Sequence, residues 1–480
     1  MEFKRAFVST LLHTILRNRV VRNIALKRFD SWLYEDLVIK NPEGRPKKVQ
    51  EDKYIALSAL LYSIIRNIEK GYISNEVSFK IINTLVKGAF LKGGREAEIR
   101  FEEKYGYGPP AFITISPTKR CNLRCPGCYA SSSATAKDTL EFDIVDEIVK
   151  QAHDLWGSRF MVISGGEPLV YKSQGKDIFS LFERHPDMFF LMYTNGTLID
   201  RKAAEKMAQL GNVTPAVSVE GFRKETEERR GRGVFKKILE AFENLRNAGV
   251  PFGASVTATR KNSPVLMKEK FYDFYFEEQG CSYMWIFHYM PIGRDYDLSL
   301  MPTPQQRVKL FWKWKEILLK KRYFVADFWN SGTLANGCIA FARPGGYFYI
   351  DWHGNIMPCV FVPYYKDNVK ELFRKGKNLN DAIMSDFFKK GRNWQFKYAL
   401  RRKGVETGNL LMPCSIRDHY EIFKRIADDV KVKPEDEAAK KAIKDEKYYK
   451  SMVEFDKKLE KLTERIWEEE YLKIEEKETV

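Results

Sequence analysis

Three cysteines stand close together in the stretch Thr118–Tyr129 and are the residues of this sequence best suited to chemistry. Cys121, Cys125 and Cys128 follow a Cys-x3-Cys-x2-Cys spacing, and no fourth cysteine lies beside them. Cysteine thiolates are the usual ligands of iron–sulfur clusters. Three thiolates in one short loop therefore suit a cubane cluster in which one iron stays open to a substrate or cofactor.

A zinc site and a disulfide are the ordinary alternatives for such a loop. Structural zinc takes four ligands, usually in two pairs, and no second pair lies at that spacing in this chain. Disulfides need an oxidising compartment and usually an even number of cysteines, whereas this chain has seven. The spacing therefore favours the cluster over both alternatives.

Six short apolar runs alternate with helical patterns through the middle of the chain. The runs are residues 111–116, 160–164, 189–194, 216–219, 252–259 and 284–289. Alternation of strands with helices favours a parallel sheet, and six repeats fit a partial (β/α) barrel. The sequence thus predicts an α/β protein built around a TIM-like (β/α)6 core.

Polar and glycine-containing motifs follow five of the six runs directly. They are the cysteine loop, Gly165-Gly166-Glu167-Pro168, Asn195-Gly196, Glu220-Gly221 and Pro291-Ile292-Gly293. In barrels of this kind the carboxyl ends of the strands build the active site. We therefore expect all five motifs on one rim of the barrel.

In this combination, residues 111–295 resemble the radical SAM superfamily. The resemblance implies that Cys121, Cys125 and Cys128 ligate a [4Fe–4S] cluster whose fourth iron chelates S-adenosylmethionine (SAM). It also implies that one electron cleaves the sulfonium, and that the resulting 5′-deoxyadenosyl radical abstracts hydrogen from an unactivated C–H bond. The protein then has to position the cofactor and exclude water.

The resemblance further implies a set of SAM contacts. Gly165–Pro168 fits the motif that receives the methionyl amino group, because glycines permit close backbone approach and a carboxylate can pair with an ammonium. Ser218 and Glu220 stand where family members often contact the ribose, and Arg230 where an arginine often pairs with the SAM carboxylate. The alternative for each is an ordinary surface polar residue. The expected contacts are Tyr129, Gly165, Gly166, Glu167, Pro168, Asn195, Ser218, Glu220 and Arg230.

One position departs from the family pattern. Many members carry an aromatic residue immediately before the third cysteine, whereas this chain has Gly127 there and Tyr129 just after it. We therefore expect adenine to rest on backbone or on Tyr129.

A second set of cysteines lies in the C-terminal half. Cys338, Gly354 and Cys359 follow a Cys-x15-Gly-x4-Cys spacing that resembles the opening of the auxiliary-cluster domain called SPASM, or of its shorter twitch form. The resemblance implies one auxiliary [4Fe–4S] cluster on Cys338, Cys359 and the distant Cys414, with a fourth site that is open, substrate-bound or filled by another group. The alternative is three buried structural cysteines.

The residues around this second set have simpler expectations. Gly354 suits the turn of a hairpin with residues 347–350 and 356–357 as its arms. Cys281 is expected to be a core thiol. His353 and His419 lie near the auxiliary cysteines in the sequence, and ordinary hydrogen bonds are expected for both.

Four regions are predicted along the 480 residues. Residues 1–108 form a basic helical region, 109–300 the radical SAM core, 301–430 the SPASM/twitch-like domain and 431–480 a charged helical tail. The tail has one narrow apolar face, so we expect it to pack on the body or on a partner.

Composition limits the class of protein and its partners. Apolar residues make up 44% of the chain, which is enough for a packed core. The formal net charge is +17 without a recognisable nucleic-acid motif, so no nucleic acid is expected. Ferredoxin or flavodoxin, which are acidic, are the expected electron donors. Abundant Lys and Glu resemble the proteins of hyperthermophiles.

The N-terminus bears on localisation. No run reaches the roughly 18–20 apolar residues that span a membrane, and Ala6–Leu16 lacks a signal-peptide cleavage site, which predicts a cytoplasmic protein. Residues 1–28 hold seven Lys or Arg against one acid. They fit an amphipathic helix on an anionic membrane surface, and the alternative is a set of helices that cap the barrel.

Three functions are weighed for this combination. The first is an enzyme that forms C–C bonds between lipid hydrocarbon chains, because domain order and composition are broadly similar to those of archaeal enzymes that join tetraether lipid chains. The second is a maturase that makes C–S or C–C crosslinks in a ribosomal peptide, although residues 1–108 give no hairpin signal for a winged-helix peptide-binding domain. The third is a scaffold that keeps clusters without turnover, against which the intact rim motifs argue.

Overall fold

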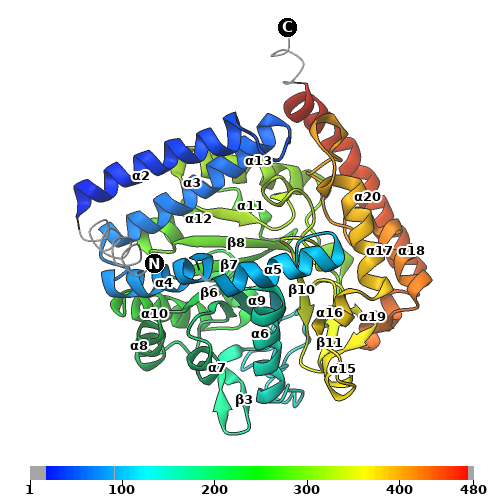
Figure 1. The fold of residues 1–480 in the computed structure, drawn as a ribbon, viewed down its shortest axis with the longest axis horizontal. Coiled ribbons are helices and arrows are strands. Elements are labelled where there is room, and N and C mark those ends of the chain that lie inside the picture. The colour runs from blue at the N-terminus through cyan, green and yellow to red at the C-terminus, as the bar shows by residue number, and fades with distance from the viewer. Residues whose placement is uncertain (1–17, 91, 474–480) are drawn as a thin grey trace.

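Six parallel strands, paired in chain order, form the centre of the molecule (Figure 1). Each strand pairs with the next one along the chain, as a partial (β/α) barrel requires. They are β1 (Phe112–Ile115), β2 (Phe160–Ile163), β5 (Phe189–Thr194), β6 (Val213–Val219), β7 (Gly253–Ala258) and β8 (Tyr283–His288). The computed structural model describes residues 18–90 and 92–473, and within them the predicted α/β fold with a partial barrel is confirmed.

The six strands coincide with the six apolar runs of the sequence because both faces of the sheet are covered. Parallel strands buried on both faces have continuous rather than alternating apolar patterns. Val162, Leu191 and Ala216 pack inside the barrel, and the opposite face of the strands packs against the helices. These helices are α6 (Phe142–Trp156), α7 (Ile178–Arg184), α8 (Arg201–Leu210), α10 (Val234–Asn247) and α12 (Glu269–Asp273).

The sheet continues beyond the barrel strands at both ends. β9 (Val325–Asp327) pairs in parallel with β8, and β10 (Tyr347–Ile350) pairs in parallel with β1. β11 (Asn355–Met357) returns antiparallel to β10, with Gly354 at a φ of +87° in the turn, which confirms the predicted hairpin. β13 (Asp367–Asn368) completes a ten-stranded sheet whose ends, β9 and β13, do not pair with each other.

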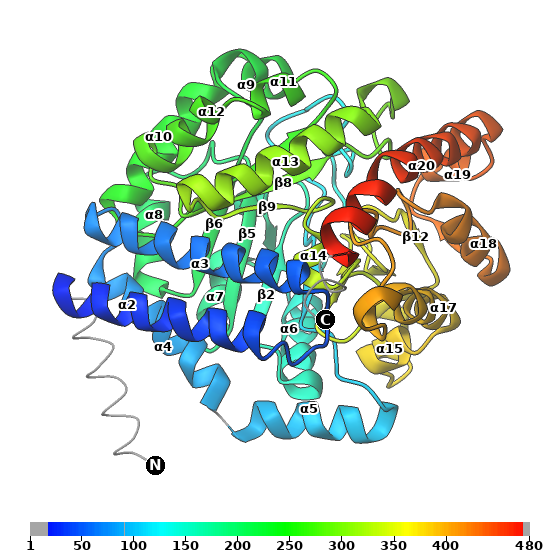
Figure 2. The same cartoon turned by 90° about the horizontal axis from the view of Figure 1, so that it is seen from above.

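Helices from the N-terminal region cover one side of the barrel (Figures 1 and 2). They are α2 (Arg19–Tyr34), η1 (Glu35–Ile39), α3 (Lys47–Glu69), α4 (Asn75–Phe90) and α5 (Lys92–Tyr105). These helices lie within residues 1–108, the region that the sequence predicts to be helical. α2 begins where Asn18 accepts the backbone N–H groups of Val20 and Val21. The predicted helical content before residue 18 lies outside the described residues.

The C-terminal half wraps around the open side of the sheet and returns to the N-terminal helices. Asp52 of α3 accepts a hydrogen bond from Tyr471 at 2.7 Å and pairs with Lys315 at 3.1 Å, and Leu459 is fully buried. The charged tail therefore packs on the body, as predicted. The main helices here are α13 (Pro304–Lys321), α14 (Gly332–Ala335), α15 (Val369–Arg374), α16 (Leu379–Ile383), α17 (Asp386–Gln395), α18 (Tyr420–Val430), α19 (Glu437–Ala442), α20 (Glu446–Ile466) and η7 (Trp467–Leu472).

Shorter elements connect these parts. They are η2 (Pro168–Val170), β3 (Lys172–Ser173), β4 (Lys176–Asp177), α9 (Arg223–Arg230), α11 (Ser263–Leu266), η3 (Phe274–Glu278), η4 (Leu298–Leu300), β12 (Tyr364–Tyr365), η5 (Phe396–Leu400), η6 (Gly404–Glu406) and β14 (Lys433–Pro434). In the part of the chain that the structure describes, none of the helices has the length and apolar character needed to cross a membrane.

Candidate active site

The three cysteines of the first motif line a single cavity of about 390 Å³ at the carboxyl ends of the barrel strands. Cys121, Cys125 and Cys128 all come from the loop after β1. Six of the nine expected SAM contacts line the same cavity, namely Tyr129, Gly165, Gly166, Asn195, Ser218 and Arg230. The other three, Glu167, Pro168 and Glu220, stand behind this surface. The SAM contacts themselves stay predictions.

Glycine is required where the loop after β2 crosses the cysteine loop. A Cβ at Gly166 would lie 2.0 Å from the carbonyl oxygen of Arg120, and Gly165 has a φ of +118°. Gly166 N–H donates to the Thr118 carbonyl and Glu167 N–H to the Arg120 carbonyl, both at 2.8 Å. The two loops therefore form one backbone unit that no larger side chain could enter.

Glu167 fastens this unit to the end of β5. Its buried carboxylate accepts the Thr194 hydroxyl at 2.7 Å and the Asn195 N–H at 2.8 Å. Burial raises the pKa of the Glu167 carboxyl, and the hydrogen bond from the Asn195 N–H acts against that rise. Asn195 in turn directs its side-chain amide to the sulfur of Cys121 at 3.7 Å. Glu167 thus positions a residue of the cavity wall from behind.

Two arginines give one edge of the cavity a positive charge. Arg229 and Arg230 both line it, and both pair with the same oxygen of Glu220 at 2.6 Å. The other Glu220 oxygen is buried and has no partner among the described residues. One carboxylate against two guanidinium groups leaves net positive charge at this edge, which suits an anionic group of a ligand.

The donor set fits an iron–sulfur cubane. The Leu123 N–H points to the sulfur of Cys121 at 3.4 Å, and burial raises the pKa of the Cys121 thiol to about 12, so metal binding has to displace its proton. Among the described residues, no group of three or more His, Cys, Asp or Glu side chains is placed to hold a metal ion. Cysteine thiolates are nevertheless the ligand type that iron–sulfur clusters take.

An aromatic ring from another strand occupies the space beside Gly127. A Cβ there would lie 2.7 Å from a ring carbon of Tyr289, which follows β8 and lines the cavity. The ring of Tyr129 is fixed by a hydrogen bond of 2.8 Å to Ser164. Both tyrosines line the cavity; the sequence pointed to backbone or to Tyr129 as the contact for adenine.

The second cysteine set lines a separate cavity of about 330 Å³ at the gap between β9 and β10. Cys338, Cys359 and Cys414 all face it, and α3 and α14 contribute the rest of its cover. Five side chains line both this cavity and the first one. This shared wall consists of Trp285, Phe328, Ile339, Tyr347 and Phe361.

The three sulfurs of the second set interact within the protein. A hydrogen bond from Cys414 lowers the pKa of the Cys338 thiol to about 7, and the Tyr347 hydroxyl lies 2.9 Å from the sulfur of Cys359. A low thiol pKa favours the thiolate, which is the form that binds metals. The donor set, its burial and the room beside it therefore fit an auxiliary cluster.

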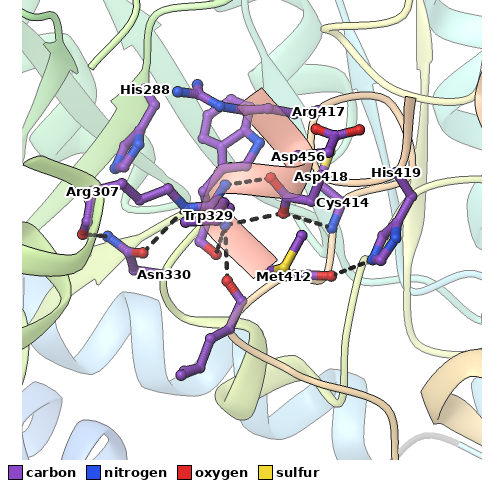
Figure 3. A network of polar contacts seen from close by, with 12 residues as sticks. His288, Arg307, Trp329, Asn330, Met412, Cys414, Arg417, Asp418, His419 and Asp456 are labelled. Carbon is purple, nitrogen blue, oxygen red and sulfur yellow. Dashed lines mark hydrogen bonds and ion pairs between the residues drawn. The ribbon is translucent and has the colours of Figure 1, made fainter. Parts of the chain in front are cut away.

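A buried ion pair holds the loop that carries Cys414 (Figure 3). Arg307 of α13 pairs through both terminal nitrogens with Asp418, and the same carboxylate accepts the Cys414 N–H at 3.1 Å. Arg307 also donates to the carbonyl oxygens of Trp329 and Leu411. The position of Cys414 thus depends on a helix more than 90 residues earlier in the chain.

A family comparison agrees with this geometry. Residues 115–260 match the family model described as the radical SAM superfamily, and this stretch contains the first cysteine loop, the Gly165–Pro168 loop and the Glu220–Arg230 edge. Residues 115–260 are therefore a radical SAM domain.

Proteins similar to this chain have names that point to different substrates. The chain is 31% identical over 161 residues to the Fe-coproporphyrin III synthase of Methanosarcina barkeri, which covers 31% of this chain and 37% of that protein. It is 26% identical over 294 residues to the AdoMet-dependent heme synthase of the same organism, and the match covers 55% of this chain and 80% of that protein. It is 28% identical over 309 residues to the mycofactocin maturase MftC of Mycolicibacterium smegmatis, and the match covers 60% of this chain and 74% of that protein.

The other cysteine and histidine residues lie where the sequence suggested. Cys281 is a buried core residue. His353 pairs with Asp138 at 3.3 Å, and His419 contacts the Met412 carbonyl at 2.9 Å. Neither histidine lines the second cavity.

Sequence reasoning missed a histidine at the rim and the charged residues behind Cys414. His288 ends β8, lines the first cavity and contacts the buried Asp327 at 2.9 Å, while Arg307 and Asp418 join α13 to the cysteine loop. The sequence held one signal for the charged residues behind Cys414. Two charged side chains follow this expected ligand within four residues, in the run Cys414-Ser-Ile-Arg417-Asp418. His288 stood inside an apolar run and gave none.

Proposed function

We propose that the protein binds SAM and two [4Fe–4S] clusters, one at each cysteine triad, and oxidises a C–H bond of a substrate held at the wall between them. The observation that carries the proposal is that wall, five side chains that line both cavities. Cys121, Cys125 and Cys128 would hold the first cluster, and Cys338, Cys359 and Cys414 the second. Bound there, these groups would supply a 5′-deoxyadenosyl radical that takes a hydrogen atom, and an acceptor for the electron that follows it.

The chain itself would exclude water. Phe328, Tyr347 and Phe361 form an aromatic surface on which an unstable carbon radical would be kept away from water. His288 is fully buried beside this surface, and its Nε2 donates to Asp327 at 2.9 Å. Burial lowers the pKa of His288, which favours the neutral ring.

The substrate class that we propose is a peptide. Support comes from the similarity to a maturase over most of that relative's length and from a second triad placed beside the first cavity. The described residues between 18 and 105 contain helices and no strand, so a peptide would have to bind without a winged-helix domain in this region. The edge strands β9 and β13 of the sheet offer backbone groups for such binding.

A second candidate substrate is a lipid hydrocarbon chain, as the sequence first suggested. The specific observation in its favour is the apolar lining of the second cavity, where Ala56, Leu57 and Phe324 line the same space as the three cysteines. The relatives named above give a lipid substrate no support, so we rank it below the peptide.

The test is anaerobic reconstitution with iron and sulfide, followed by incubation with SAM and a strong reductant. We expect 5′-deoxyadenosine by liquid chromatography, and a loss of two hydrogens by mass spectrometry in a peptide encoded beside the gene. A parallel reaction with membrane lipid extracts tests the second candidate. Failure of the fully loaded protein to cleave SAM would overturn the proposal itself, and product in the lipid reaction alone would overturn the substrate class.

A further inference from the structure

Exposed apolar side chains gather on the outer surface of the N-terminal helices. Seven of the twelve large apolar side chains that are exposed among the described residues lie on α2, η1 and α3, so they form a patch instead of scattered positions. We call this patch the N-terminal apolar face. Its members are Val20, Ile24, Phe29, Trp32, Tyr34, Ile39 and Leu57.

The opposite side of α2 is what holds the helix to the protein. Leu26 and Leu33 are buried, and Asp30 accepts a hydrogen bond from Tyr54 of α3 at 3.0 Å. The outward side carries Val20 and Ile24 at a spacing of four, followed by Lys27 and Arg28. These outward residues are not used by the fold, so their apolar and basic character points to something outside it.

The face adjoins the second cavity. Leu57 is 43% exposed and also lines that cavity. Its neighbours in α3, Tyr54 and Ser58, are hydrogen-bonded to Asp30 of α2, and the ring of Tyr34 lies 5.1 Å from that of Tyr54. Figure 2 shows α2 beside α3, so the aromatic end of α2 lies close to the part of α3 that lines the second cavity.

We propose that the N-terminal apolar face docks on the surface of an anionic membrane, with α2 lying in the plane of the headgroups. The charges match this partner: residues 1–28 hold seven basic side chains against one acid, and the whole chain carries +17. Trp and Tyr are the residues favoured at the membrane–water interface, and Trp32 and Tyr34 stand at the cavity end of α2. Glu35 is the exposed acid at that end.

A second copy of the chain fits the face less well. Self-pairing through a two-fold axis would bring Lys27 and Arg28 of one copy towards the same residues of the other, and like charges repel. A membrane satisfies both the apolar and the basic side chains. Docking in this way would bring the second cavity close to the bilayer. This inference does not depend on the proposed function.

Vesicle sedimentation with the full-length, reconstituted protein tests the inference. We expect binding to vesicles that contain about one-third phosphatidylglycerol, and binding to pure phosphatidylcholine weaker by about tenfold or more. The variants Lys27→Gln/Arg28→Gln and Ile24→Ser/Trp32→Ser should each lose about tenfold or more of the anionic-vesicle binding. The matched control is Val405→Ser, an exposed apolar residue on η6, which should bind like the native protein.

Each variant should cleave SAM at the native rate, which shows that it is folded. Equal binding of both vesicle types, or native binding by both double variants, would overturn the inference. So would a dimer in light scattering that Ile24→Ser/Trp32→Ser dissociates, because a second copy would then cover the face. Vesicle binding that appears only when residues 2–17 are deleted would overturn it as well, since that segment would then be the natural cover.

Discussion

The two cysteine triads are built in opposite ways. Cys121, Cys125 and Cys128 come from a single loop after β1, and backbone contacts with the Gly165–Gly166 loop hold that loop in place. Cys338, Cys359 and Cys414 are brought together from separate segments. A local triad needs only the right spacing and small neighbours, whereas a triad from distant segments needs tertiary contacts that fix each segment independently.

A fully buried ion pair is the second difference between the triads. Arginines donate to the backbone of both sets, Arg294 to the Cys125 carbonyl at 2.8 Å and Arg343 through its Nε–H to the Cys338 carbonyl at 2.6 Å, but the loop that carries Cys414 also depends on the buried Arg307–Asp418 pair. A buried ion pair loses several kcal/mol when one partner is removed. The second triad should therefore be sensitive to substitutions that touch no cysteine.

The largest effect should follow from damage to the first triad. Cys125→Ala removes one of three cluster ligands, so we expect SAM cleavage to fall by about 10³-fold or more and the iron content to fall by about half. Iron assays and 5′-deoxyadenosine formation measure both. The second cluster should survive, and its loss in this variant would mean that the triads are not independent.

Damage to the second triad should separate the two halves of the reaction. In Cys414→Ala we expect half of the iron to be lost and substrate oxidation to stop, while SAM cleavage without substrate continues within about threefold of native. The matched control is Cys281→Ala, which removes a buried thiol that faces neither cavity. Iron loss in the control equal to that in Cys414→Ala would contradict the assignment of ligands.

Arg307 tests the charged support of the second triad. Arg307→Met leaves Asp418 buried without its partner and should lower the free energy of unfolding by about 3–5 kcal/mol. It should also weaken iron retention at the second triad and leave the first triad unaffected. Denaturant titration and iron content under chelator challenge measure the two effects. The control Lys206→Gln breaks the exposed pair with Glu183 and should change stability by less than about 1 kcal/mol. Equal effects would contradict the special role of the buried pair.

The smallest effect concerns pH. Burial raises the pKa of Asp456 to about 9 from an ordinary 3.8; its carboxylate accepts the Tyr420 N–H at 2.7 Å. The folded protein therefore holds this proton more tightly, and stability is lost as pH rises from about 4 towards 9.

Asp456→Asn cannot lose a proton in that range, so its stability should fall less than that of the native protein between pH 4 and pH 8, and the two proteins should be similar at pH 4. Urea titrations at the two pH values measure the difference. Asp428→Asn, an exposed carboxyl paired with Lys424, is the control. A stability difference that does not depend on pH would contradict the raised pKa.

The sequence predicted the features that depend on local pattern. These features are the six barrel strands, the Gly354 hairpin and the first triad. Each depends on residues that lie close together in the sequence, so the sequence pattern alone indicates it. The Arg307–Asp418 pair joins residues 111 positions apart, and no periodicity marks such partners. β9 was missed because three residues are too few to show an apolar pattern. Asp327 of β9 contacts His288 of β8 only because these two strands pair.

The central claim is that the two triads hold two different clusters and that SAM binds only at the first. Mössbauer spectroscopy of ⁵⁷Fe-reconstituted protein, with and without SAM, tests it most directly in the native chain and in two triple-alanine variants, one per triad. We predict about eight irons in the native protein and about four in each variant, with a SAM-induced change in the native protein and in the variant that keeps Cys121, Cys125 and Cys128. Iron at one triad only, or a SAM response from the variant that keeps Cys338, Cys359 and Cys414, would contradict the account.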